Sequence, residues 1–244
     1  MNFKIIFFDI DGTLTPNGRT ALPSIKVREA IRKASKKVYT SVATGRSLLQ
    51  AKEMLGNTVI NGYSTYASGA QIINPVTEEI ISEKLLSTTQ LNETLSIYKK
   101  YGRKLMVYDN GVPKEMGPDI QRPLSAWTPG VSPDEVREIL KELNKIKGIN
   151  IHTTISWEYG KNDIHISNEK ADKYLAITEI LKILDIKKEE AMAVGDGPND
   201  LGLFKACGFK VAMGDGTKEL IDEADYVTSD LAHDGVAKAL DKFI

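Results

Sequence analysis

Two acidic residues that could do chemistry together, Asp9 and Asp11, follow an apolar run rich in Ile and Phe over residues 5–8. Such a run predicts a strand that is buried on both faces. Residues two apart in an extended chain point to the same side, so the two carboxylates would lie close together and repel each other. A hard cation such as Mg²⁺ would compensate this repulsion, because Mg²⁺ binds one or two carboxylates together with phosphate oxygens of a substrate. The simpler alternative is an Asp-Gly turn that carries two solvated acids.

A second polar turn, Thr44-Gly45-Arg46, follows a predicted strand over residues 38–43 and precedes a predicted helix over residues 47–55. Its hydroxyl and its free backbone N–H groups are donors of the kind that bind phosphate at helix N-termini. An ordinary strand-to-helix turn also needs small polar residues. This motif alone is therefore equally compatible with a purely structural role.

A Gly-rich acidic loop, Gly195-Asp196-Gly197-Pro198-Asn199-Asp200, follows a third predicted strand over residues 191–194. In an open parallel sheet, ligands bind outside the carboxyl ends of the strands. The acids of this loop can therefore meet Asp9 and Asp11 at one edge of the sheet. Four carboxylates at that edge form an oxygen-rich cage suited to Mg²⁺.

The chemistry predicted for such a cage is phosphoryl transfer. A carboxylate beside the metal can attack phosphorus and form an aspartyl phosphate. A second carboxylate two residues further on can give a proton to the leaving oxygen and then take one from water. The transferred group carries dispersed negative charge, which amide, hydroxyl and lysine donors would stabilise.

These three motifs, in this order and spacing, resemble the haloacid dehalogenase (HAD) superfamily, in its Cof-like type IIB branch of phosphatases with a C2-type cap inserted after the second motif. The resemblance covers essentially the whole chain. It implies that Asp9 is the nucleophile, that Asp11 is the general acid and base, and that Mg²⁺ is the cofactor. The implied metal-binding residues are Asp9, Asp11 through its backbone carbonyl, Asp196 and Asp200, the last in or next to the coordination shell. The implied substrate-binding residues are Thr44, Gly45, Lys173 and Asn199.

Two lysines, Lys170 and Lys173, are candidates for the lysine that forms the family's third motif. In the family this lysine lies at the start of a helix, about 23 residues before the first Asp of the acidic loop, and we use this spacing as a hypothesis. The run that begins at Lys173 matches this pattern and Lys170 does not, although Tyr174 stands where the family usually has Gly. The alternative is that both are solvated helix lysines.

The order of predicted elements indicates two domains. Strands alternate with helices in residues 1–82 and again in residues 170–244, which is typical of a doubly wound parallel sheet, and the resemblance makes this a Rossmann-like HAD core. Residues 83–169 predict a smaller inserted α+β cap domain. Because residues 112–131 contain four prolines, we expect them to be mostly loop with one edge strand. A short strand is also expected at Val59-Ile60.

The cap resembles that of archaeal-type phosphoglycolate phosphatases and of sugar-phosphate phosphatases. By that resemblance, cap and core would open and close over the substrate. His165, shortly before Lys173, is a candidate substrate contact, and a strand residue that faces solvent or the cap core is the more ordinary interpretation. Further candidates are Arg122, Trp127, Trp157 and Tyr159, of which the aromatic residues are more often part of a core.

The composition is that of a soluble globular protein: 244 residues, 41% hydrophobic and 27% charged, with a formal net charge of −1. This balance argues against nucleic acid as a partner, and no apolar run approaches the ~20 residues of a membrane span. A single cysteine, Cys207, excludes an intrachain disulfide. Together with the lack of a signal-peptide pattern, it predicts a cytoplasmic protein. The expected partner is a small phosphorylated metabolite, and the sequence gives no indication of the oligomeric state.

Two other functions remain open at this point. A phosphomannomutase-like phosphotransferase would use the same chemistry and would return the phosphate to a sugar. A phospho-acceptor signalling module, resembling response-regulator receivers, also combines acids, a Thr and a Lys on a doubly wound sheet. The inserted middle domain and the acidic pair at a single strand end argue against the receiver.

Overall fold

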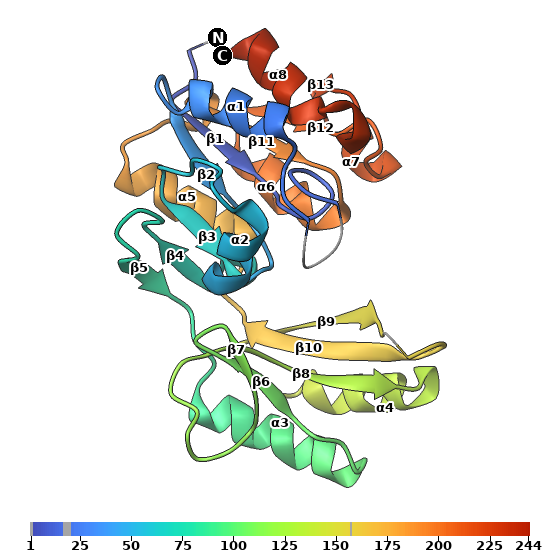
Figure 1. Ribbon diagram of the computed structural model, residues 1–244. Helices are drawn as coiled ribbons and strands as arrows, with labels where there is room; N and C mark the ends of the chain where they lie inside the picture. The colour runs from blue at the N-terminus through green and yellow to red at the C-terminus, as the bar shows by residue number, and fades with distance from the viewer. Residues whose placement is uncertain (1, 17–20, 157) are drawn as a thin grey trace. The chain divides into compact units, whose positions relative to one another are not determined.

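The computed structural model describes residues 2–16, 21–156 and 158–244 (Figure 1). The chain divides into two compact units. The first, here called the core unit, comprises Met1–Glu83 and Asp172–Ile244, and the second, the inserted unit, comprises Lys84–Ala171. The sequence places these boundaries after residues 82 and 169.

The core unit is built on a five-stranded sheet in the order β13-β12-β11-β1-β2, and every pair in it is parallel. The strands are β1 (Ile5–Phe8), β2 (Tyr39–Val42), β11 (Ala191–Gly195), β12 (Phe209–Ala212) and β13 (Tyr226–Val227). Phe8, the last residue of β1, lies opposite Val42 and Val194 in its two neighbours. The residues that follow these three strands therefore leave the sheet side by side.

Helices cover both faces of this sheet (Figure 1). Ile6 and Phe8 of β1 pack into one apolar cluster, and Ile5 and Phe7 pack into the other, so alternate side chains serve opposite faces. The first cluster includes residues of α1 (Ile25–Ala34), α2 (Leu48–Leu55) and α8 (Gly235–Phe243). The second includes residues of α5 (Lys173–Ile183), α6 (Leu201–Ala206) and α7 (Lys218–Asp222). The predicted doubly wound α/β fold is confirmed.

A small antiparallel sheet of β3 (Ser64–Tyr66), β4 (Gln71–Ile73) and β5 (Ile80–Glu83) completes the core unit. The strand expected at Val59-Ile60 is wrong, because this segment is coil. Side-chain hydrogen bonds supplement the backbone there: Thr40 of β2 donates its backbone N–H to Asn61 Oδ1 at 2.8 Å and its hydroxyl to the Val59 carbonyl at 2.9 Å. The Thr40 carbonyl accepts from the backbone N–H groups of Asn61 and Gly62, each at 3.0 Å. In the described part of the chain, short 3₁₀ segments lie at Ala67–Gly69, Lys188–Glu190, Pro198–Asp200 and Leu231–His233.

The inserted unit is a five-stranded antiparallel sheet in the order β7-β6-β8-β10-β9 with two helices. Its elements are α3 (Thr88–Lys100), β6 (Met106–Asp109), β7 (Val112–Glu115), β8 (Pro123–Val131), α4 (Pro133–Leu143), β9 (Ile149–Ile155) and β10 (Asn162–Asn168). Side chains from both helices and from the sheet form one apolar cluster. The unit has the expected α+β class.

The expectation that residues 112–131 are mostly loop is wrong, because they contain β7 and the nine-residue β8 at the centre of the sheet. The prolines are tolerated for positional reasons. Pro113 lies in the edge strand β7, and Pro123 is the first residue of β8. Pro129 lies where the register against β10 shifts, so no ladder hydrogen bond is required of it.

Cys207 is fully buried in the core unit, and this burial raises the pKa of its thiol above the ordinary value. Among the described helices, none has both the length and the apolar character that crossing a bilayer requires.

Candidate active site

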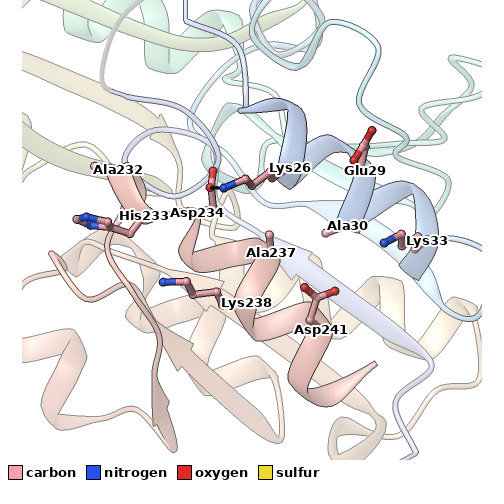
Figure 2. Close-up of a pocket in the computed structure, with 10 residues that line it drawn as sticks. All are labelled: Lys26, Glu29, Ala30, Lys33, Ala232, His233, Asp234, Ala237, Lys238 and Asp241. Atoms are coloured by element: carbon pink, nitrogen blue, oxygen red, sulfur yellow. Dashed lines mark ion pairs between the residues drawn. The ribbon is translucent and has the colours of Figure 1, made fainter.

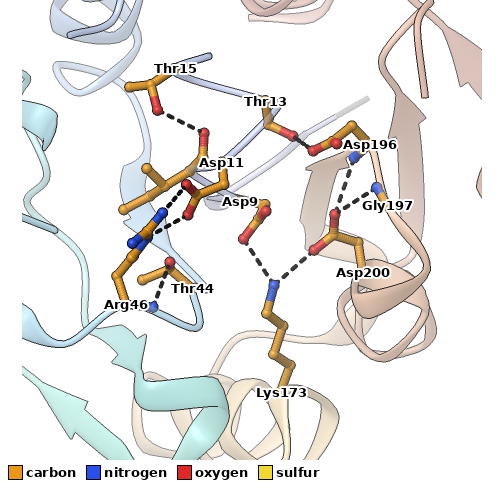
Figure 3. Close-up of polar contacts among 11 residues, drawn as sticks. Asp9, Asp11, Thr13, Thr15, Thr44, Arg46, Lys173, Asp196, Gly197 and Asp200 are labelled. Atoms are coloured by element: carbon orange, nitrogen blue, oxygen red, sulfur yellow. Dashed lines mark hydrogen bonds and ion pairs between the residues drawn. The ribbon is translucent and has the colours of Figure 1, made fainter. Parts of the chain in front are cut away.

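The ends of β1, β2 and β11 bring the predicted site residues together (Figure 3). Asp9 follows β1 and is only 2% exposed, and Asp196 follows β11. Carboxylate oxygens of Asp9, Asp196 and Asp200 all lie within 4.8 Å of one another. The parallel register that aligns the strand ends is what joins acids from opposite ends of the chain.

Lys173 is the cation inside this acid cluster. It is the first residue of α5, behind the N-cap Asp172, and it is 5% exposed. Its Nζ donates to Asp9 Oδ1 at 2.9 Å and to Asp200 Oδ1 at 2.8 Å. Burial alone would lower the pKa of Lys173, but the two carboxylates outweigh it and raise that pKa above its usual value. Lys170, the competing lysine, is exposed in the inserted unit.

Asp200 has both carboxylate oxygens engaged by protein donors. Oδ1 accepts from Lys173, and Oδ2 accepts from the backbone N–H groups of Asp196 at 3.1 Å and Gly197 at 3.2 Å. The side chain is fully buried. Asp200 therefore shapes the acidic loop and holds the lysine, and its oxygens are the least available of the cluster to a further ligand.

Lys173 alone does not neutralise the negative charge of the three carboxylates in the acid cluster. Burial raises the pKa of Asp9 to about 7, with Lys173 opposing this and Asp200 adding to it. Burial also raises the pKa of Asp196 to about 6, although the Thr13 hydroxyl donates to its Oδ1 at 2.7 Å. Three carboxylates around one ammonium group favour a further positive charge, and an all-oxygen donor set suits a hard divalent cation. The residues present therefore fit Mg²⁺.

Gly12 allows Asp196 to approach the turn after β1. Its φ is +82°, and a Cβ on this residue would lie 2.2 Å from Asp196 Oδ2. A side chain at position 12 would displace the Asp196 carboxylate from the acid cluster. Glycine is required here both for its backbone conformation and for the space above it.

We expect Gly12→Ala to reduce both kcat/KM and Mg²⁺ affinity by at least about 10-fold, the usual effect of disturbing a metal ligand's support. Gly102→Ala is the matched control, because Gly102 has φ +63° and a Cβ there would meet nothing within 4 Å. Both variants carry a similar strain from an alanine at positive φ, about 1 kcal/mol. Activity titrated against Mg²⁺ separates the two effects, and equal losses in both variants would contradict the role of Gly12.

The turn Thr44-Gly45-Arg46 lies at the end of β2, with Thr44 fully buried and Gly45 exposed. Ser47 caps α2 directly after it, in a reciprocal pair with Gln50. Arg46 donates through Nε to Asp11 Oδ2 at 2.9 Å and through Nη2 to Asp11 Oδ1 at 2.6 Å (Figure 3). No role was predicted for Arg46. An arginine and an acid that follow adjacent strands of a parallel sheet are the signal that could have indicated this pair.

The remaining candidates lie in different surroundings. Asn199 is exposed in the 3₁₀ turn beside Asp200. In the inserted unit, the ring of Trp127 stacks on Tyr108 with centroids 4.4 Å apart, and His165 stacks on His152 at 4.9 Å. Burial lowers the pKa of His165 to about 4, so its ring is neutral at physiological pH. Tyr159 is fully exposed, Arg122 directly precedes β8, and Trp157 lies outside the described residues.

A separate pocket lies between α1 and α8 in the core unit, with a cavity of about 400 Å³ (Figure 2). Its positive and negative side chains balance, and Lys26 pairs with Asp234 at 3.3 Å. The predicted site residues are not among those that line it in the described part of the chain. The charged residues of this pocket are Lys26, Glu29, Lys33, Asp234, Lys238 and Asp241.

Comparison with known proteins supports the family resemblance that the three motifs indicate. The family model for haloacid dehalogenase-like hydrolases matches residues 6–115 and 127–240. The chain is 28% identical to a 5-amino-6-(5-phospho-D-ribitylamino)uracil phosphatase of Bacillus subtilis, over 98% of this chain and 95% of that protein. It is also 28% identical to a phosphoglycolate phosphatase of Methanothermobacter thermautotrophicus, over 99% of both.

Solved structures show the same fold. A haloacid dehalogenase-like hydrolase from Bacteroides thetaiotaomicron superposes with a TM-score of 0.83 at 22% identity, covering 99% of this chain and 100% of that one. A Thermotoga maritima protein superposes with a TM-score of 0.80, also at 22% identity, covering 99% and 98%. The resemblance predicted from the three motifs is confirmed, and the chain belongs to the haloacid dehalogenase-like hydrolases.

Proposed function

We propose that the protein is a Mg²⁺-dependent phosphatase that hydrolyses small organic phosphate monoesters through an aspartyl phosphate on Asp9. The observation that carries this proposal is the buried contact of Asp9 with Lys173, beside the carboxylates of Asp196 and Asp200. The family match and relatives named as phosphatases support the reaction class.

Mg²⁺ would be held by Asp9, Asp196 and the backbone carbonyl of Asp11. Asp200 would support the ion through water, because both of its oxygens already accept hydrogen bonds from the protein. When bound, Mg²⁺ would neutralise charge on the phosphoryl oxygens and orient the group toward Asp9.

The chain's own residues would carry both chemical steps. The Asp9 carboxylate attacks phosphorus while the ester P–O bond breaks, and the Asp11 carboxyl group gives its proton to the leaving oxygen. In the second step Asp11, now a carboxylate, takes a proton from water as that water attacks phosphorus and displaces Asp9. The Thr44 hydroxyl and the Gly45 N–H would donate to the phosphoryl oxygens, and Lys173 would hold Asp9 in line.

Phosphoglycolate and a phosphorylated sugar-alcohol derivative, 5-amino-6-(5-phospho-D-ribitylamino)uracil, are the substrates that the relatives' names favour. The test is a panel of phosphate esters that includes both classes and p-nitrophenyl phosphate, with inorganic phosphate release measured with Mg²⁺ and with EDTA. We expect turnover that EDTA abolishes. A stable acyl phosphate without turnover would indicate a receiver-like module, and transfer of phosphate within a hexose phosphate without its release would indicate a phosphomutase.

The acid cluster also predicts how stability depends on pH and Mg²⁺. In the folded protein the pKa of Asp9 is about 7 and that of Asp196 about 6, both above the ordinary value of 3.8. Between about pH 4 and about pH 7, the folded protein therefore binds more protons than the unfolded chain. The stability of the metal-free protein should therefore fall as pH rises from about 4 to about 7. Mg²⁺ binds the ionised carboxylates and should raise the Tm more at about pH 7.5 than at about pH 5.

Thermal unfolding with Mg²⁺ and with EDTA at both pH values measures this effect. Asp196→Asn, which removes one titrating carboxylate, should reduce both the Mg²⁺-induced rise in Tm and the pH dependence. Equal rises in Tm at the two pH values would contradict the linkage between ionisation of this cluster and metal binding.

A further inference from the structure

A groove in the core unit lies between the neighbouring helices α5 and α6 and the segment that joins α5 to β11 (Figure 1). Its cavity has a volume of about 290 Å³, close to the lower end of the range for small-molecule sites. The apolar side chains that line it are buried and form its floor: Leu181, Ile186 and Ala206. In the described part of the chain, no member of the acid cluster lines this groove, so it is separate from the candidate active site.

The rim of the groove is positively charged. Lys182 and Lys205 lie in the last turns of α5 and α6, Lys188 begins the 3₁₀ segment before β11, and all three are exposed. Among the described residues, no Asp or Glu lines the groove and none of these three lysines forms an ion pair. The pocket between α1 and α8 differs, because carboxylates accompany its lysines. In a chain with a formal net charge of −1, this local excess of positive charge favours an anionic ligand.

Tyr174 gives the groove an aromatic wall. It is the second residue of α5 and is half-buried, and Lys205 Nζ lies 4.7 Å from the centre of its ring. The face of the ring attracts the ammonium group, so this lysine stays close to the wall. One turn further on, Thr178 donates its hydroxyl to the Tyr174 carbonyl at 2.7 Å, so that hydroxyl is already used within the helix. The groove therefore offers a ligand ammonium groups, an aromatic ring and an apolar floor.

We propose that this groove binds a small aromatic dianion, a compound with one flat ring system and two acidic groups. The ring system covers the apolar floor and packs beside Tyr174, and the burial of apolar surface favours binding. The acidic groups accept hydrogen bonds from the ammonium groups of the rim and offset the repulsion among the lysines. A simple inorganic anion would leave the floor in water, and a neutral ring would leave the lysines unpaired. This inference does not depend on the proposed phosphatase activity.

The test measures binding of 1,5-naphthalenedisulfonate, an aromatic dianion, to the full chain by equilibrium dialysis with EDTA present. The probe contains no phosphate ester, so turnover at the acid cluster does not contribute to the signal. We expect saturable binding of one probe per chain. The triple variant Lys182→Gln, Lys188→Gln and Lys205→Gln should bind it at least about 10-fold more weakly, since each exposed ion pair contributes about 2- to 5-fold.

A matched variant and two simpler probes isolate the groove. Lys141→Gln, Lys145→Gln and Lys147→Gln together remove three exposed lysines of the inserted unit and should change the affinity by less than about 2-fold, because distant exposed charges are screened. The neutral 1,5-dihydroxynaphthalene keeps the ring system, and inorganic sulfate keeps two charges. Each should bind at least about 10-fold more weakly than the disulfonate, because each lacks one of the two contributions.

The inference would be overturned by a wild type that shows no saturable binding, or by a groove variant that keeps the wild-type affinity. An equal loss in the inserted-unit variant would also overturn it, as would an affinity for either simpler probe equal to that for the disulfonate. The groove variant should keep the wild-type Tm, because its three positions are exposed. If its Tm is lower, Lys182→Gln and Lys205→Gln replace it as single variants, and each should weaken binding about 2- to 5-fold.

Discussion

Asp9→Asn is expected to lower kcat by at least about 10⁴-fold, the scale seen when a covalent nucleophile is removed. The amide has the shape of the carboxylate but cannot form an acyl phosphate, so the loss should be in kcat with every ester of the panel. Acid-quenched reactions with ³²P-labelled substrate should show protein-bound label in the wild type and none in the variant.

Folding of the Asp9→Asn variant should be unimpaired. Lys173 keeps its contact with Asp200, and the costly burial of the Asp9 charge is removed. The Tm of the metal-free variant should therefore equal or exceed that of the wild type at about pH 7.5. Turnover equal to the wild type would exclude Asp9 as the nucleophile, and lost activity with a collapsed Tm would assign it a structural role.

Lys173→Met is expected to lower both activity and stability. Removing the ammonium group leaves Asp9 and Asp200 buried without their shared cation, which should cost about 3–5 kcal/mol of unfolding free energy. The kcat should fall by about 10²–10³-fold, because Asp9 loses its positioning and the phosphoryl group loses a neighbouring cation. Chemical unfolding and steady-state kinetics measure the two effects.

The pH dependence identifies the cause of the stability loss in Lys173→Met. Without the ammonium group the pKa of the buried Asp9 carboxylate rises further, so the added instability should grow as pH rises and shrink toward about pH 5. Lys170→Met is the matched control, because Lys170 is exposed, and it should change stability by less than about 0.5 kcal/mol. A similar loss of stability in both variants would contradict the role of Lys173 as the buried cation that Asp9 and Asp200 share.

The parts of the fold that could be predicted depend on short-range patterns. The Ile-Phe run of β1 predicts burial on both faces, and alternate residues of it do enter two different apolar clusters. The polar residues at three strand ends predict a common edge because parallel strands share their direction. Spacing within the family's motif favours Lys173 over Lys170, and Lys173 is the one that lies among the acids.

The parts that could not be predicted depend on long-range register. The Arg46–Asp11 contact exists because Phe8 of β1 lies opposite Val42 of β2, and no local pattern in the sequence specifies that pairing. Likewise, the prolines of β8 suggest a loop until the register shift opposite Pro129 and the position of Pro123 at the strand start are known. Hydrogen bonds between strands decide where a proline can be accommodated, and the strand's own residues do not reveal them.

The burial of Cys207 makes the chain convenient for spectroscopy. A thiol with no solvent access and a raised pKa should not react with maleimides while the protein is folded. New cysteines at exposed positions, one in each unit, would then accept a donor and an acceptor dye without background labelling. Energy transfer between the dyes could follow the separation of the two units as substrate is added.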